Sequence, residues 1–151
     1  MLEQNIKRVR TSTLLRRLFK APNLNRFIEE NEGCLQTVLF HKYVSELCRT
    51  AGCIPEQVIK KTSIERTYGH QIFNGTRSPS RDKVIQLAFG FGLDVDGAQE
   101  LLKVALKSPL HPKIKRDAAI LYCISHHMSE MITQNILLEL DLTLLGGTKD
   151  G

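Results

Sequence analysis

Apolar residues recur at intervals of three and four along most of the chain, which is the period of amphipathic helices. Val84, Leu87, Ala88 and Phe91 follow this spacing. No stretch alternates between apolar and polar residues for the length of a strand, and no internal repeat is evident. The pattern predicts an all-α protein with helices near residues 12–20, 23–30, 40–51, 55–59, 63–73, 80–91, 98–105, 113–127 and 129–140.

Residues that begin or end helices stand at the borders of these segments. The expected N-caps are Thr62-Ser63, Ser80 and Ser129, and the expected ends are Gly52, Gly75 and Gly92. Residues 108–112 contain two prolines and are expected to connect separate helices. The expected inward-facing residues include Ile64, Tyr68 and Ile72, then Ile114, Ala118, Leu121 and Tyr122, and finally Ile132, Ile136, Leu137 and Leu140.

Residues 53–80 hold two short predicted helices with a tight turn between them, which is the arrangement of a helix-turn-helix. The second helix of such a unit enters the major groove of DNA, where its side chains contact base edges. The expected base contacts, which lie on one side of this helix, are Arg66, Thr67, His70 and Gln71. Arginine binds guanine, and glutamine binds adenine, through two hydrogen bonds.

Positive charges flank this predicted recognition helix. Lysine and arginine neutralise DNA phosphates, and the free N–H groups at the start of a helix bind them as well. The expected phosphate contacts are Lys60, Lys61, Arg77, Ser80, Arg81 and Lys83.

Residues 72–80, with the sequence IFNGTRSPS, resemble the end of the recognition helix and the following basic loop in the lambda-repressor/Cro-like (XRE-type) helix-turn-helix family. Residues 87–93 are similar to the fourth helix of that family and its exit. The resemblance covers about residues 39–102. It implies a lambda-repressor-like helix-turn-helix bundle, here with extra N- and C-terminal helices, and a bacterial or phage regulator of transcription.

Three positions depart from the family pattern. Pro55 stands where the family commonly has a phosphate-binding glutamine, and Ser63 stands at the usual turn glycine. Gly69 replaces the apolar residue usually buried in the recognition helix. Glu65 would repel phosphate unless it caps a helix or accepts a hydrogen bond from cytosine.

The net charge of +5 is unevenly distributed: +3 over residues 1–40, +4 over 41–92 and −2 over 93–151. The positive charge of residues 1–92 suits an anionic partner such as DNA, although it is equally compatible with a surface that is merely soluble. The expected organisation is a basic helical extension (1–38), a helix-turn-helix domain (39–107), a helical pair (113–145) and a flexible tail (146–151).

Both flanking segments leave two interpretations open. The N-terminal basic residues are Lys7, Arg8, Arg10, Arg16 and Arg17. They form either an auxiliary DNA arm or the polar face of a packed helix. The C-terminal helices either wrap the middle domain or form a homodimer interface. Glycines 146, 147 and 151 suggest a frayed end.

Other chemistries have little support in the sequence. The only hints of metal ligands are Cys48 with Cys53, and Cys123 with His126 and His127, and neither forms the paired spacing of a zinc site. We expect no metal, no cofactor and no catalytic residue, since no nucleophile or phosphate-binding motif occurs. Without a membrane-spanning run or a secretion signal, a cytoplasmic protein, nucleoid-associated when bound, is expected.

The sequence therefore favours a non-enzymatic, sequence-specific regulator that binds double-stranded DNA with the helix near residues 66–73 in the major groove. The alternative is a protein-interaction adaptor or antitoxin-like partner that uses the helix-turn-helix as a scaffold and binds an unidentified protein.

Overall fold

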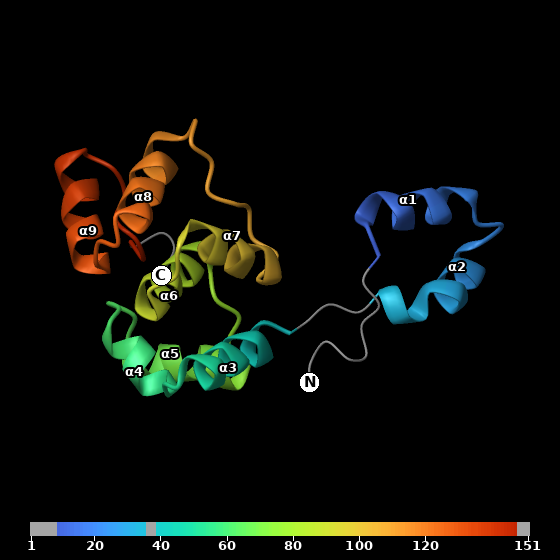
Figure 1. Ribbon diagram of the computed structural model, residues 1–151, viewed down its shortest axis with the longest axis horizontal. Coiled ribbons are helices and arrows are strands. Elements are labelled where there is room, and N and C mark those ends of the chain that lie inside the picture. Colours follow the sequence, from blue (N-terminus) through green and yellow to red (C-terminus); the bar gives the residue numbers. More distant parts are fainter. Residues whose placement is uncertain (1–8, 36–38, 148–151) are drawn as a thin grey trace. The chain divides into compact units, whose positions relative to one another are not determined.

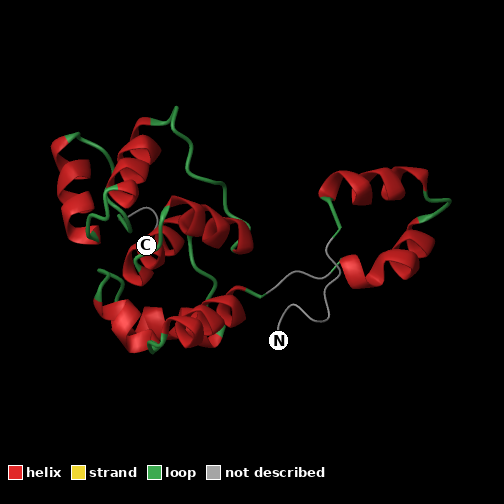
Figure 2. Cartoon of the chain, viewed as in Figure 1, coloured by secondary structure: helices red, strands yellow, loops and turns green. Residues whose placement is uncertain are grey.

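The computed structural model describes residues 9–35 and 39–147, and within these ranges it holds helices and no strand (Figure 2), so the all-α prediction is confirmed. The chain divides into two compact units, Met1–Val38 and Leu39–Gly151 (Figure 1). None of the described helices is long and apolar enough to cross a membrane.

The N-terminal unit is a pair of short helices followed by one 3-10 turn. Helix α1 spans Thr11–Lys20, α2 spans Leu24–Asn31 and η1 spans Glu32–Cys34. The side chain of Asn23 accepts a hydrogen bond from the Arg26 N–H and so caps α2. Only Phe27 and Asn31 are buried in these helices, while α1 buries no residue.

The second unit contains the remaining helices. Their bounds are Phe40–Ala51 for α3, Pro55–Lys60 for α4, Arg66–Asn74 for α5, Arg81–Phe91 for α6, Val95–Val104 for α7, Lys115–Ser125 for α8 and Glu130–Glu139 for α9. Gly52, Gly75 and Gly92 adopt the left-handed conformation at the ends of α3, α5 and α6. These three helix ends are confirmed.

Helix α6 lies at the centre of this unit. It packs against α4, α7 and α9, and residues 82–88 are all buried. The buried stretch includes the polar residues Asp82, Lys83 and Gln86. A buried charge is costly unless it is paired, so the position of α6 depends on partners for these groups.

An Arg-Asp dipeptide in the first turn of α6 pairs with the same dipeptide in the first turn of α8. Arg81 binds Asp117 through two hydrogen bonds of 3.2 and 2.9 Å, and Arg116 binds Asp82 through two of 3.0 and 2.8 Å. Each arginine also donates to two carbonyls in the segment that follows its helix pair: Ser108 and Pro109 for the first, Thr143 and Leu144 for the second.

These contacts belong to an internal repeat that the sequence pattern did not reveal. Gln99 of α7 bonds both backbone groups of Leu110, and Gln134 of α9 bonds both backbone groups of Leu145, at 2.8 and 2.9 Å in each case. The equivalent residues are 35 positions apart, as Arg81 is from Arg116. Helices α6–α7 and α8–α9, each with its following segment, are therefore two copies of one structural unit, and the expectation of no repeat was wrong.

The prediction of which residues face inward in the C-terminal helices was also partly wrong. Four residues predicted to face inward are exposed: Ile114, Tyr122, Ile132 and Leu140. The arginine pairs turn α8 so that Ile120, Cys123 and Ile124 are buried instead. Leu145 is buried and the Gly146 N–H donates to Asp82, so the chain is still packed at these two residues. Gly147 of the expected tail is also described, and its N–H donates to the Leu144 carbonyl at 3.1 Å, while residues 148–151 lie outside the described residues.

We expect Asp82→Ala and Asp117→Ala each to lower the free energy of unfolding by about 3–5 kcal/mol, because each leaves a half-buried arginine, Arg116 or Arg81, without its carboxylate. Urea unfolding measures this change. Since the two aspartates are equivalent, their losses should be similar. Asp96→Ala, at an exposed position of α7, is the control. A loss under about 1 kcal/mol at either buried aspartate would contradict the assigned role of the pairs.

Candidate nucleic-acid interface

Helices α4 and α5 are joined by a short turn and cross closely. A Cβ atom added to Gly69 would lie 2.8–2.9 Å from side-chain carbons of Ile59, so only glycine fits this crossing. Pro55 is the first residue of α4, where its missing N–H costs nothing. These two departures from the resembled family therefore have local structural reasons.

Helix α5 begins later than the sequence predicted. Its N-cap is Glu65, whose carboxylate accepts hydrogen bonds from the N–H groups of Thr67 and Tyr68 at 2.8 and 3.1 Å. The expected cap at Thr62-Ser63 was wrong, because these residues form the turn itself. The hydrogen bonds from Thr67 and Tyr68 hold the pKa of Glu65 below its ordinary value.

The turn between α4 and α5 is held by a carboxylate from α9. Glu130, which is buried, accepts a 2.7 Å hydrogen bond from the Ser63 N–H and another from the Ser63 hydroxyl. Gln86 of α6 and Gln134 of α9 donate to the same carboxylate at 3.2 and 3.0 Å. Ser63 avoids a positive φ, so the turn does not need the glycine of the resembled family.

Arg66 projects from the start of α5 and is held by Glu56 of α4. Its Nε lies 3.0 Å from one oxygen of Glu56 and 3.2 Å from the other, and its side chain is 73% exposed. Neither Nη nitrogen bonds another residue in the described ranges. His70, one turn along α5, lies 2.6 Å from Glu56 through Nε2. These contacts, with the bond to His70 as the largest cause, lower the pKa of Glu56.

A second arginine is held at the opposite end of α5. Arg77 donates from Nε to the side-chain oxygen of Gln71 at 3.0 Å, and its guanidinium lies 4.5 Å from the centre of the Tyr68 ring. Lys83 lies 5.3 Å from the same ring centre. The Arg66 and Arg77 side chains are thus both bonded through Nε, and no hydrogen bond joins their outer guanidinium nitrogens to another residue in the described ranges.

The residues predicted to contact phosphate divide into two groups. Lys60, Lys61 and Arg77 are exposed. Arg81 is bound to Asp117 and to two carbonyls, and Lys83 is only 8% exposed. Arg81 and Lys83 therefore stabilise the interior of the unit and do not belong to the candidate DNA-binding surface. Ser80 caps α6 by accepting from the Lys83 N–H.

Sequence reasoning missed the two glutamates that organise this surface. Glu56 is ten residues from Arg66, and Glu130 is 67 residues from Ser63. No local pattern signals either contact, because each depends on how two helices pack. The structure brings Arg66 and His70 together through Glu56, and Gln71 and Arg77 through a direct bond, while Thr67 is exposed on the same helix.

The cysteines show no sign of ligand chemistry. Cys48 is buried and hydrogen-bonded to Cys53, and burial is the main cause that raises the pKa of the Cys48 thiol to about 12. A metal needs the thiolate, which this pKa disfavours near neutral pH. Within the described residues no group of three or more histidine, cysteine or acidic residues is placed to hold a metal ion.

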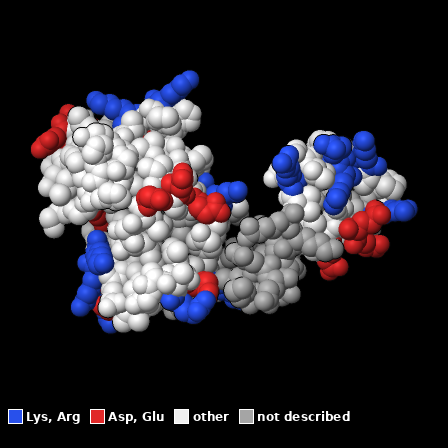
Figure 3. All heavy atoms as spheres, in the orientation of Figure 1, with Lys and Arg blue, Asp and Glu red and all other residues white. Residues whose placement is uncertain are grey.

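The C-terminal helices take part in the core and still expose apolar surface. Leu137 and Leu145 are buried, whereas Met131 is 75% exposed and Leu138 is 65% exposed. The wrapping role is therefore visible in the contacts, and the homodimer through these helices stays a prediction. In the view of Figure 3, much of the surface of this unit carries no charged atoms.

Comparisons of the chain with models of known families, with curated proteins and with solved structures find no match. The candidate interface therefore depends on the geometry described above.

We expect the protein to lose stability as the pH falls below about 4.5, the ordinary glutamate pKa. Since folding lowers the pKa of Glu65, its carboxylate stabilises the fold above pH 4.5 and ceases to do so as acid protonates it. Glu65→Gln should make the acid-side fall in the free energy of unfolding shallower, as measured by urea unfolding between pH 3 and 7. Glu100→Gln, at an exposed position of α7, should leave the fall unchanged. An identical pH profile for Glu65→Gln and wild type would refute the capping role.

We expect Glu130→Ala to lower the free energy of unfolding by at least about 2 kcal/mol, because it leaves the Ser63 N–H without its acceptor and removes one of the two acceptors of each of the Gln86 and Gln134 amide nitrogens. Amide hydrogen exchange at Ser63 should accelerate as well. Glu139→Ala, on the exposed side of the same helix, should change stability by less than about 0.5 kcal/mol. Unchanged exchange at Ser63 would show that Glu130 does not hold the turn.

Proposed function

We propose that the protein is a sequence-specific, non-enzymatic regulator that binds double-stranded DNA through a lambda-repressor-like helix-turn-helix formed by α4 and α5. The observation that carries the proposal is the arrangement of Arg66 at the start of α5. Glu56 bonds its Nε, and neither Nη nitrogen bonds another described residue, so both keep their donors for another partner. Guanine offers two acceptors in the major groove that match this pair of donors.

The rest of α5 supports the same function. Thr67 is exposed beside Arg66, and Gln71 uses only its side-chain oxygen in binding Arg77. The Gln71 amide nitrogen therefore keeps its donors for a base. Lys60 and Lys61 are exposed at the end of α4, and lysine neutralises phosphates.

Holding the arginine before DNA arrives has an energetic consequence. A free arginine side chain loses about 2 kcal/mol of rotamer entropy when it is fixed. Glu56 imposes part of this restriction in the unbound protein, so less remains to be lost on binding. The same carboxylate would repel a phosphate, which favours contact of Arg66 with a base edge over contact with the backbone.

We expect Arg66→Ala to lower the preference of the protein for its best duplex over a scrambled duplex by about five-fold or more, since a bidentate guanine contact discriminates by about 1–3 kcal/mol. The best duplex is selected from a randomised library, and fluorescence anisotropy at several salt concentrations measures both affinities. Glu56→Gln should weaken the same guanine preference while raising affinity for scrambled DNA.

Arg49→Ala is the matched control, since Arg49 is an exposed arginine paired with Glu46 on α3. This variant should keep the preference. Wild-type protein that binds no duplex at low salt, or an Arg66→Ala variant with unchanged preference, would overturn the proposed function.

A further inference from the structure

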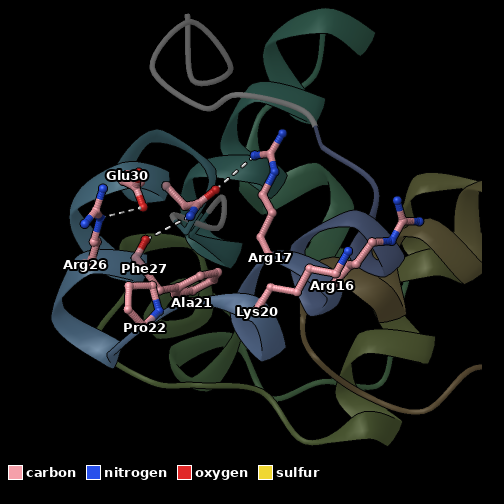
Figure 4. A pocket seen from close by; sticks show the side chains of 9 residues that line it. Arg16, Arg17, Lys20, Ala21, Pro22, Arg26, Phe27 and Glu30 are labelled. Atoms are coloured by element: carbon pink, nitrogen blue, oxygen red, sulfur yellow. Dashed lines mark hydrogen bonds and ion pairs between the residues drawn. The ribbon is translucent and has the colours of Figure 1, made fainter.

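The N-terminal unit contains a hollow that the function proposed above does not use. It lies between α1 and α2, is open to one side and has a volume of about 740 Å³. Ala21, Pro22 and the buried ring of Phe27 form its apolar part (Figure 4). The polar lining residues are Arg16, Arg17, Lys20, Arg26, Glu30 and Asn31.

The charges in this hollow are strongly unbalanced. Its lining has four cations and one carboxylate, Glu30, which lies 3.6 Å from the Nε of Arg26. Arg16 and Lys20 are exposed and bond no other described residue. In Figure 3 the blue atoms of this unit gather on one part of its surface and the red atoms on another.

One of the cations is held in place by a buried group. Arg17 donates from Nη1 to the side-chain oxygen of Asn31 at 2.9 Å, and Asn31 is 6% exposed. The Asn31 amide in turn donates to the Phe27 carbonyl at 2.9 Å. The α2 helix therefore positions an arginine of α1 on the rim of the hollow.

Helix stability does not account for this arrangement. Cations in the last turn of a helix interact favourably with its dipole by about 0.3–1 kcal/mol, which applies to Arg17 and Lys20. Arg16 and Lys20 are four residues apart on one helix, where like charges repel each other. Arg26 comes from α2 and adds a further positive charge to the same space. Such a cluster is stabilised by an anion.

We propose that this hollow is a phosphate-binding site. The inference rests on the proposed DNA-binding function for the source of the phosphate: backbone phosphates of bound DNA are the expected occupants, and a free phosphate is the other source of the same chemistry. Arg16, Lys20 and Arg26 supply the charge, and Arg17, fixed by Asn31, supplies a directed donor. The N-terminal unit is then a second, sequence-independent contact to DNA.

The test is the salt dependence of duplex binding by the full chain. Arg16→Gln/Lys20→Gln removes two cations that have no described partner, so the fold should persist, as circular dichroism verifies. The slope of log K against log salt should fall by about 2, since each phosphate contact contributes about 0.9. The base preference that Arg66 provides should remain.

Lys113→Gln/Lys115→Gln is the matched control, because it makes the same change in net charge at exposed positions around the start of α8. This variant should keep the wild-type slope. Equal slopes for the two double variants would overturn DNA as the source of the phosphate, because net charge alone would then explain the salt dependence of duplex binding. If the wild-type protein shows no base preference and the slope still falls only in Arg16→Gln/Lys20→Gln, the proposed function is refuted. The phosphate-binding site in the hollow is then still supported.

Nuclear magnetic resonance titrations distinguish the two phosphate sources. Duplex DNA that shifts the backbone signals of residues 16–30 in wild type and not in Arg16→Gln/Lys20→Gln supports the site with DNA as the source. Inorganic phosphate that produces these shifts when duplex does not supports the site with a free phosphate as the source. No shift in this segment with either ligand overturns the inference.

Discussion

The reciprocal pairing of Arg81 with Asp117 and of Arg116 with Asp82 is the constraint on which the second unit depends. Both carboxylates are buried, so each arginine is required where it stands and also fixes the segment that follows its helix pair. In each of the two Arg-Asp dipeptides, the arginine binds the aspartate of the other dipeptide. The two copies of the repeat are therefore related to each other as the subunits of a two-fold symmetric dimer are. The C-terminal helices are therefore an integral part of the core.

This attachment determines the geometry of the candidate interface. Once α8 and α9 are fixed on α6, Glu130 reaches the turn before α5 and bonds Ser63 twice. The position of α5 then follows from the turn, from its cap at Glu65 and from the close crossing at Gly69. The orientation of Arg66 and Arg77 depends on the position of α5, so the buried carboxylate of α9 acts on the candidate interface through the turn.

The sequence predicted those features that local chemistry decides. The helix ends at Gly52, Gly75 and Gly92 follow from residues that tolerate the left-handed conformation, and Ser80 and Ser129 are N-caps as expected. Arg81 and Lys83 had the composition of a phosphate contact, but the pairing of Arg81 with Asp117 and the burial of Lys83 come from packing. The repeat escaped notice because its two copies share hydrogen-bonding roles at Gln99 and Gln134 while most of their apolar residues differ.

The distance along the chain between Ser63 and Glu130 has a consequence for biosynthesis. The two residues are 67 positions apart, so α4, α5 and the turn between them are translated well before their carboxylate. Contacts of this range form late, since the intervening chain must first be ordered. On a ribosome helix α5 therefore emerges before Glu130 is available to hold the turn, and the candidate interface reaches its final geometry only after residue 130 has been added and folded.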